Sequence, residues 1–235
     1  PRAIIYVACD PAALARDTAY LSEAGYALTF MAKPNEREGN SSHIHLSFRG
    51  LNGELVMTDE ADKEHGMSDL GRQFIAGQLA HMRELSILFA PNINSYKRYV
   101  PGSFAPTAIR WGRDNRTCAF RLVGRGAGLR LENRIPGGDV NPYLAVAGII
   151  AAGLDGITKK MKLEPAFTGN AYVSDSPRVP STMNEALDLW EKSAWVKETF
   201  GDEVQAHYAN MARVEIAAYG KAVTDWELFR NFERF

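Results

Sequence analysis

Alternating apolar and polar positions predict several short strands along the chain. Residues 43–48 alternate strictly, so that polar side chains occupy one face and apolar side chains the other. The polar face carries His43, His45 and Ser47. Apolar or alternating runs predict further strands at residues 3–7, 28–32, 108–111, 117–122 and 128–134, and Asn52-Gly53 is typical of a hairpin turn.

Helical periodicity and capping signals predict the remaining elements. A helix begins at Asp10-Pro11 and ends at Gly25, and a long amphipathic helix runs from Ser68 until Pro91 stops it. Asn141-Pro142 opens an apolar helix that continues to residue 157. Capping boxes at residues 182–185 and 224–227 begin two more helices, and another begins at residue 202. The pattern as a whole predicts an α+β fold.

Composition is that of an ordinary globular protein and excludes several classes. The 235 residues are 46% hydrophobic and 23% charged, with a formal net charge of −1. Proteins that coat nucleic acids or anionic membranes are normally far more basic, so we expect neither partner. The longest apolar run, residues 143–154, is too short to cross a bilayer, and no secretory signal is present. We therefore expect a cytoplasmic location.

Positive charge is concentrated in one stretch of this nearly neutral chain. Between Lys97 and Arg134 the formal charge is +7, and all but one of the cations are arginines. Arginine binds carboxylates and phosphates through two parallel hydrogen bonds, whereas a solvated basic face uses more lysine. The stretch indicates either an arginine-rich surface sheet or a pocket for anionic groups.

Two of the predicted strands carry chemically active side chains on one face. His43 and His45 could share a metal ion, or they could lie on the exposed face of a half-buried sheet. Arg130, Glu132 and Arg134 repeat the same spacing with charges, which fits a salt-bridge ladder or a metal-binding carboxylate between anion-binding arginines. Together the two strands favour a site for Mg²⁺ or Mn²⁺ and a nucleotide.

Several motifs, in order along the chain, resemble the catalytic domain of the glutamine synthetase family. They are TFMAKP, EGNSSHIHLS, NSYKRYVPGSFAPT, WGRDNRT, LRLENRIPGGDVNPYLA and AAGLDGI. The closing segment, from residue 181 to the end, is similar to the branch that includes γ-glutamylpolyamine synthetases. The resemblance implies an antiparallel, partly barrel-like sheet wrapped by helices over residues 28–235, incomplete at its N-terminal side.

The resemblance also implies roles for individual residues. His43 and Glu132 match ligands of the metal ion that faces the ATP phosphates, and His45 and Ser47 match nucleotide contacts. Arg98, Arg134 and the Gly39 backbone carbonyl match groups that hold the substrate glutamate. The arginines that match positions around the ATP phosphates and the transferring phosphoryl group are Arg116, Arg121 and Arg130, of which Arg116 and Arg130 are the expected catalytic residues.

The implied reaction is the ATP-dependent ligation of glutamate to an amine through γ-glutamyl phosphate. Ammonia-using members carry a glutamate at the position of Phe104, within Pro101-Gly102-Ser103-Phe104. A phenyl ring cannot accept a proton but can pack against an alkyl chain or face a cation. We therefore expect an organic amine or polyamine as acceptor; the alternatives are an ammonia-using enzyme and a purely structural role for Phe104.

The first 27 residues depart from this pattern. Residues 4–25 resemble the C-terminal part of RNA 5-methyluridine methyltransferases, in which a nucleophilic cysteine matches Cys9. We interpret Cys9 as a vestige and divide the chain into a fused segment, residues 1–27, and a partial glutamine synthetase-like domain, residues 28–235.

Three hypotheses follow for the chain as a whole. The first is a γ-glutamyl–amine ligase that, as an isolated chain, binds ATP weakly or not at all and is inactive because upstream metal ligands are missing. The second is a non-catalytic module that forms homo-oligomers or assembles with full-length subunits. The third, an RNA methyltransferase fragment, lacks a cofactor domain.

Overall fold

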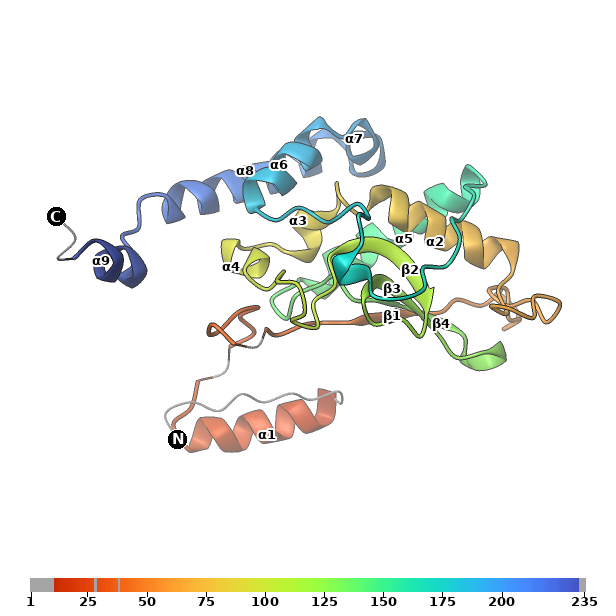
Figure 1. Ribbon diagram of the computed structural model, residues 1–235, viewed down its shortest axis with the longest axis horizontal. Coiled ribbons are helices and arrows are strands. Elements are labelled where there is room, and N and C mark those ends of the chain that lie inside the picture. Colours follow the sequence, from red (N-terminus) through yellow and green to blue (C-terminus); the bar gives the residue numbers. More distant parts are fainter. Residues whose placement is uncertain (1–10, 28, 38, 233–235) are drawn as a thin grey trace.

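The computed structural model describes residues 11–27, 29–37 and 39–232 (Figure 1). Its strands are β1 (Ile44–Leu46), β2 (Ala108–Arg113), β3 (Cys118–Val123) and β4 (Arg130–Asn133). Its helices are α1 (Pro11–Glu23), α2 (Asp69–His81), α3 (Ser86–Phe89), α4 (Ile93–Tyr96), α5 (Pro142–Thr158), α6 (Met183–Lys192), α7 (Ala194–Phe200), α8 (Asp202–Tyr219) and α9 (Asp225–Asn231). The predicted α+β class is confirmed.

The strands form one sheet in the order β1-β4-β3-β2. The β1–β4 and β4–β3 pairs are antiparallel, but β2 and β3 are parallel, so the sheet is mixed rather than antiparallel as predicted. The connection of residues 114–117 would ordinarily close a hairpin. Instead it carries the chain back along β2, and Asn115 in this connection donates hydrogen bonds to the Phe167 and Gly169 carbonyls at 3.2 and 3.0 Å. Cys118 therefore pairs with Ala108, at the start of β2.

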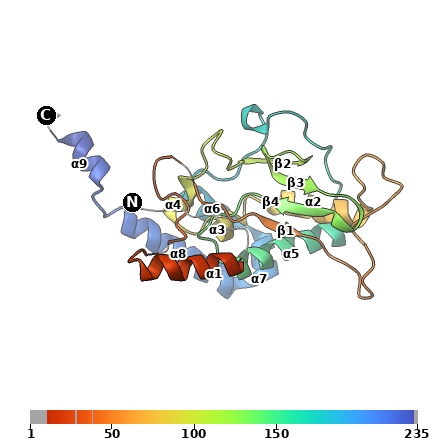
Figure 2. The same cartoon turned by 90° about the horizontal axis from the view of Figure 1, so that it is seen from below.

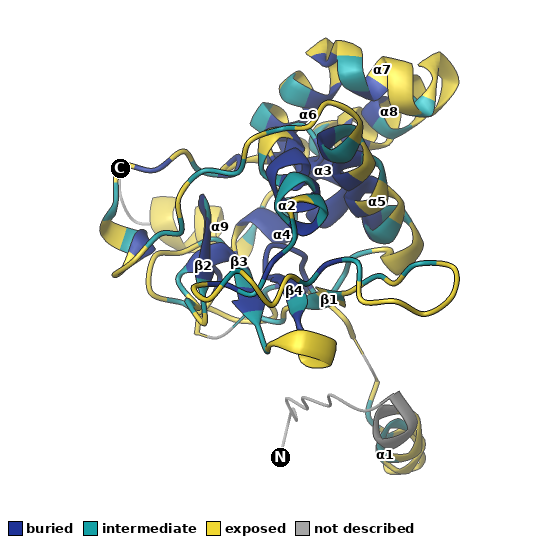
Figure 3. Ribbon diagram, turned by 90° about the vertical axis from the view of Figure 1, so that its right-hand side faces the viewer, coloured by how far each residue is buried: buried dark blue, intermediate teal, exposed yellow. Residues whose placement is uncertain are grey.

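Helices cover one face of the sheet, and the polar face lies opposite (Figure 3). The core between the layers contains Phe74 of α2, Trp111 of β2, Phe120 of β3 and Ile149 of α5, each at most 4% exposed. α2 and α5 approach closely because glycines face each other where they cross: a Cβ on Gly156 would lie 2.1 Å from the Gln73 carbonyl oxygen. The apolar face of each alternating strand therefore packs against the core, and its polar face points to the opposite side of the sheet.

Two predicted elements differ from the structure. Residues 29–32 form no strand, and the structure does not describe residues 3–7. The predicted helix from Ser68 to Leu88 divides into α2 and α3, with a turn between them. The break follows His81, whose Nε2 lies 2.8 Å from Asp155 Oδ2 on α5 and whose Nδ1 contacts Glu84 in the turn. Tertiary contacts at this position override the helical periodicity.

The ends of the described chain lie away from the sheet. α1 stands apart from the main body, and α9 lies at the far end of the C-terminal helices (Figures 1 and 2). The predicted N-caps are confirmed at Asn141 of α5, Thr182 of α6 and Thr224 of α9, where Glu227 completes the capping box. The box predicted at residues 182–185 is incomplete, because Glu185 Oε2 accepts from the Ser181 amide instead of the Thr182 amide. Among the described helices, none combines the length and the apolar character that crossing a membrane requires.

Candidate active site

The polar face of the sheet brings the two motif-bearing strands together. β1 and β4 pair so that His45 lies opposite Glu132, and β3 pairs with β4 so that Arg121 lies opposite Glu132 from the other side. The Glu132 side chain is therefore in the middle of a row that runs across three strands. Its neighbours on β1 keep the predicted alternation: His45 is exposed, whereas Ile44 and Leu46 are partly buried against the core.

Glu132 is the centre of a cluster of cationic and imidazole side chains. Its Oε1 accepts a hydrogen bond from Arg134 Nη1 at 2.8 Å and lies 3.2 Å from His43 Nδ1 and 3.7 Å from His45 Nε2. Its Oε2 accepts a hydrogen bond from Arg121 Nη1 at 3.2 Å. We call these five residues the Glu132 cluster. The same-face prediction for His43 and Glu132 is confirmed.

The cluster keeps the Glu132 carboxyl group ionised, although Glu132 is only 4% exposed. Burial by itself raises the pKa of this carboxyl, but the hydrogen bond with His43 and the charges and hydrogen bonds of Arg134 and Arg121 outweigh it. The net result is a pKa well below the usual value. Burial and nearby arginines lower the pKa of His45, against the opposing charge of Glu132. Glu132 and a neutral imidazole are both suitable metal ligands.

The spacing of His43 and Glu132 fits a shared metal ion. Adjacent ligands of an octahedral Mg²⁺, each about 2.1 Å from the ion, lie about 3 Å from one another. The 3.2 Å between His43 Nδ1 and Glu132 Oε1 is compatible with that arrangement. Within the described part of the chain, no group of three or more His, Cys, Asp or Glu side chains could hold a metal ion. By themselves the two residues could supply only part of a coordination sphere.

Arg98 and Gly39, both expected at the substrate glutamate, lie in contact with each other. Arg98 is 1% exposed and donates to Ser41 Oγ at 2.9 Å and to the Ile135 carbonyl. A Cβ on Gly39 would lie 2.6 Å from Arg98 Cγ, so only glycine lets the backbone approach this side chain. The Nε atoms of Arg98 and Arg134 are buried and have no hydrogen-bond partner among the described residues. The site thus retains unused donors for an anionic group.

The other predicted nucleotide-site residues are only partly assembled. Arg130 Nε donates to His45 Nδ1 at 3.2 Å, which places Arg130 at the exposed edge of the cluster. Ser47 is exposed and follows β1 on the same face. Arg116 does not contact Glu132; it lies in the β2–β3 connection and lines a separate cavity.

Phe104 lies in an exposed turn with unusual backbone geometry. Its side chain is 72% exposed, and its φ of 60° lies in the left-handed region, which bulky residues rarely adopt. The turn is fastened to residues 98–100, because Ser103 Oγ donates to the Val100 carbonyl at 2.6 Å and lies 3.2 Å from the Arg98 carbonyl. Strained residues of this kind concentrate at binding sites.

The structure adds two residues that the sequence did not single out. Asp114 Oδ1 accepts a hydrogen bond from Arg121 Nη2 at 2.6 Å, so Arg121 is shared between Asp114 and Glu132. The Tyr172 hydroxyl is buried without a partner among the described residues; burial raises its pKa, and the charges of Arg134 and Arg98 oppose this. Tyr172 lies in a three-residue 3-10 helix, Ala171–Val173, which is too short for any periodicity to mark it.

Comparisons with known proteins bear on the family and the fold of the chain. The model of the glutamine synthetase catalytic domain matches residues 5–231. A gamma-glutamylethanolamide synthetase from Streptomyces coelicolor is 58% identical over 230 residues, which are 97% of this chain and 49% of the relative. A glutamate–isopropylamine ligase from a Pseudomonas species is 40% identical over 89% of this chain and 46% of its own. The solved GmaS–ADP complex superposes with a TM-score of 0.82 and 32% identity, over 91% of this chain and 51% of that chain.

These matches bear on the first 27 residues and on the extent of the chain. The chain spans about half the length of the curated relatives it matches. The family match begins at residue 5, so the methyltransferase resemblance finds no support, and Cys9 lies outside the described residues. The boundary at residue 27 stays a prediction and falls inside the matched range. The continuous match over residues 5–231 shows that the chain belongs to the glutamine synthetase catalytic-domain family.

Proposed function

We propose that this chain supplies the phosphate- and glutamate-binding part of an ATP-dependent ligase that joins the γ-carboxyl group of glutamate to an organic amine. The observation that carries the proposal is the Glu132 cluster, in which one ionised carboxylate lies among His43, Arg121 and Arg134. Its excess of cationic donors suits a site where phosphate and carboxylate groups meet.

The chemistry requires activation because a free carboxylate is a poor acyl donor. An oxygen of the γ-carboxylate attacks the γ-phosphorus of ATP, ADP leaves, and γ-glutamyl phosphate forms. The amine nitrogen then attacks the acyl carbon, phosphate leaves, and the nitrogen loses a proton. Arg121 and Arg130 stabilise the charge that develops on the transferring phosphoryl group. A Mg²⁺ or Mn²⁺ ion held by His43 and Glu132 would neutralise phosphate charge.

Glutamate is held beside this centre by Arg98, Arg134 and Gly39 in the proposed arrangement. The unused Nε donors of Arg98 and Arg134 support it, because a buried donor without an acceptor costs stability unless a ligand completes it. The Gly39 backbone is close enough to Arg98 to accept the substrate's ammonium group at its carbonyl while the guanidinium takes a carboxylate. The role of Arg116 as a catalytic residue stays a prediction.

An organic amine is the proposed acceptor because of Phe104. Its exposed ring, displayed on a turn tied to the Arg98 segment, offers an apolar surface for an alkyl chain and no proton acceptor for ammonium. The names of the relatives agree: one acts on ethanolamine and another on isopropylamine. Ammonia is the alternative acceptor, since glutamine synthetases also match this chain at 37% identity.

Glutamate binding to the purified chain tests the proposal directly. Calorimetric titration with glutamate should show binding that Arg134→Lys weakens about tenfold, since lysine cannot reproduce a two-pronged contact with a carboxylate. Arg49→Lys, at an exposed arginine, is the matched control and should bind as the wild type does. A folded wild-type chain that fails to bind glutamate refutes the proposal.

Turnover is tested separately, because we expect the chain alone to be inactive. ADP release is measured with glutamate and ethanolamine, putrescine, isopropylamine or ammonia, with Glu132→Ala as the background. Release above background would overturn the expected inactivity, and its dependence on the amine would identify the acceptor. Release with ammonia alone would contradict the role proposed for Phe104.

We also propose that the chain assembles with copies of itself or with full-length subunits. α9 lies away from the body and exposes large apolar side chains: Trp226 is 68% exposed and Phe229 is 87% exposed (Figure 1). Exposed apolar surface of this kind marks interaction sites. A native mass that remains that of a single chain, both alone and with a full-length relative, would exclude this.

A further inference from the structure

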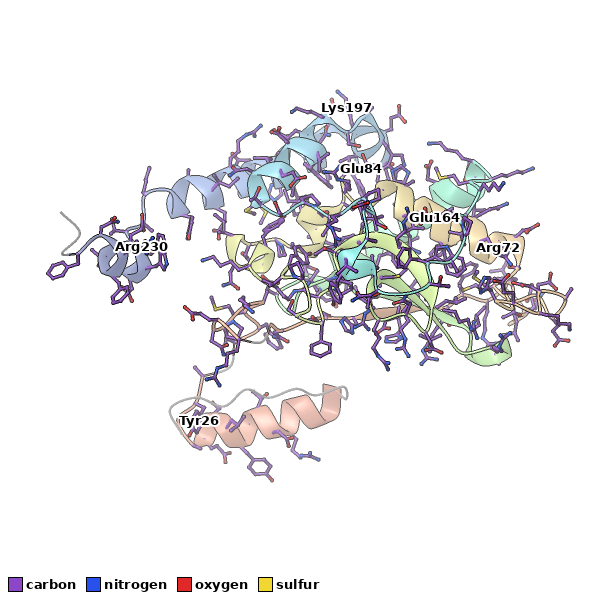
Figure 4. The ribbon with its side chains drawn as sticks, viewed as in Figure 1. Tyr26, Arg72, Glu84, Glu164, Lys197 and Arg230 are labelled. Carbon is purple, nitrogen blue, oxygen red and sulfur yellow. The ribbon has the colours of Figure 1, made fainter. Side chains whose placement is uncertain are left out.

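A cavity of about 870 Å³ lies at the β2 edge of the sheet, apart from the contacts of the Glu132 cluster. Its walls are the end of β2, the start of α2 and residues 162–169, which follow α5. Arg72 and Glu164, labelled in Figure 4, belong to its lining. Cavities of this size bind small-molecule ligands.

The wall formed by residues 162–169 is fixed to β2 by hydrogen bonds. The Trp111 indole Nε1 donates to the Glu164 carbonyl at 2.8 Å, and the Phe167 amide donates to the Trp111 carbonyl at 2.8 Å. Asn115 ties the β2–β3 connection to the same segment. Both sides of the cavity are thus held in place without a ligand, which lowers the entropic cost of binding.

The charges around the cavity do not balance. Its carboxylates Asp114 and Glu164 are paired with Arg121 and Arg110, which lie outside the lining. Glu64, largely exposed, lies 3.2 Å from His65.

The cations of the lining have fewer acidic partners. Arg72 is paired with Asp62, but Arg113, Arg116 and Lys162 form no ion pair with any described carboxylate. Arg113 donates only to the carbonyls of His65 and Gly124. Burial and the nearby positive charge of Arg125 lower the pKa of Arg113, and the charges of Asp114 and Asp62 only partly oppose this.

A buried polar atom supports the same conclusion. The His65 side chain is 10% exposed, packs edge-on against Trp111 and lines the cavity. Its Nδ1 has no hydrogen-bond partner among the described residues. Buried polar atoms are normally satisfied, so a ligand or water is expected nearby.

We propose that this cavity is a second anion site, which binds a phosphate group, either free or carried by a small metabolite, through Arg113 and Lys162. Asp114 links the site to the Glu132 cluster, because it lies on the rim and holds Arg121, which contacts Glu132. A phosphate bound here draws the cationic side chains of the connection toward itself and repels Asp114. The site can therefore change how Arg121 is shared between Asp114 and Glu132.

Titration of the ¹⁵N-labelled full chain tests the proposal. Inorganic phosphate and ribose 5-phosphate are the two probes, and the indole N–H of Trp111 and the amides of Thr168 and Gly169 are the reporters. Phosphate should shift these signals, and Lys162→Gln and Arg113→Gln should each raise the Kd read from them about tenfold. Lys221→Gln, which removes the same charge on a distant exposed lysine, should leave the Kd unchanged.

The outcomes distinguish free phosphate from a phosphorylated metabolite, and binding in the β2-edge cavity from binding at the Glu132 cluster. Tighter binding of ribose 5-phosphate identifies a phosphorylated metabolite as the ligand, and tighter binding of inorganic phosphate identifies the free ion. Shifts confined to residues of the Glu132 cluster overturn the proposal. So does a Kd that both cavity variants leave unchanged.

Discussion

Replacing Glu132 by glutamine should lower the free energy of unfolding by about 3 to 5 kcal/mol, the range measured when one partner of a buried ion pair is removed. The substitution keeps the shape of the side chain and removes only its charge. Arg134 is then left 4% exposed, and the Arg121 side chain 14% exposed, without their shared carboxylate. The amide nitrogen of glutamine would also face donors, which adds an unfavourable contact.

Urea unfolding at pH 7, followed by far-ultraviolet circular dichroism, measures this loss. Glu164→Gln is the matched control, because Glu164 also pairs with an arginine, Arg110, but both side chains are about one third exposed. Exposed pairs contribute about 1 kcal/mol or less, so the control should unfold close to the wild type. If Glu132→Gln lowers the free energy of unfolding no more than Glu164→Gln does, the Glu132 cluster does not stabilise this face of the sheet.

Two further predictions concern the layer behind the site. Gly156→Ala should lower the thermal unfolding temperature and cost about 1 to 3 kcal/mol, because its Cβ would collide with a backbone oxygen of α2; Gly148→Ala, whose nearest neighbour is a side chain at 3.4 Å, should be neutral or stabilising. Asp155→Asn should destabilise at pH 6. Burial raises the pKa of Asp155, but its contacts with His81 and Lys159 hold it below 3.8. The folded state therefore binds the Asp155 proton less readily than the unfolded state does. The ionised carboxylate stabilises the fold at pH values above 3.8, and this stabilisation is lost as the pH falls through the pKa of Asp155 in the folded state. Urea titrations should show the wild type and Asp155→Asn converging below pH 4, and a constant difference would contradict this.

The polar face of the site could be predicted from the sequence because strands have a fixed side-chain period. Alternation over residues 43–48 requires His43 and His45 to share a face, and the same period places Arg130, Glu132 and Arg134 together. Neither pattern reveals that the two strands are neighbours. The family resemblance supplied that step, and the register that sets His45 opposite Glu132 agrees with it.

The remaining features depend on contacts between distant segments. The connection between the parallel strands β2 and β3 is held by Asn115, which binds carbonyls more than fifty residues further along the chain, and no local turn signal shows this. The break between α2 and α3 follows from His81 meeting Asp155 on α5. Asp114 was not singled out in the sequence, and Arg116 lines the β2-edge cavity, while its expected place among the phosphate contacts stays a prediction. Local propensity cannot encode such positions, because tertiary contacts determine them.

The charge of the Glu132 cluster predicts how the chain responds to ligands. Two histidines, His43 and His45, and two arginines, Arg121 and Arg134, lie around Glu132, and a third arginine, Arg130, contacts His45. The negative charges of Glu132 and Asp114 do not balance the three arginines. Repulsion among these cations opposes folding of the ligand-free chain, and bound anions relieve it. A ligand that binds only the folded state raises its stability by mass action. At the same concentration, glutamate should therefore raise the thermal unfolding temperature of the wild type more than that of Arg134→Lys, and glutamine, which lacks the γ-carboxylate charge, should stabilise the wild type less than glutamate does. Equal stabilisation by both amino acids would mean that the excess positive charge does not recognise the group that the proposed reaction activates.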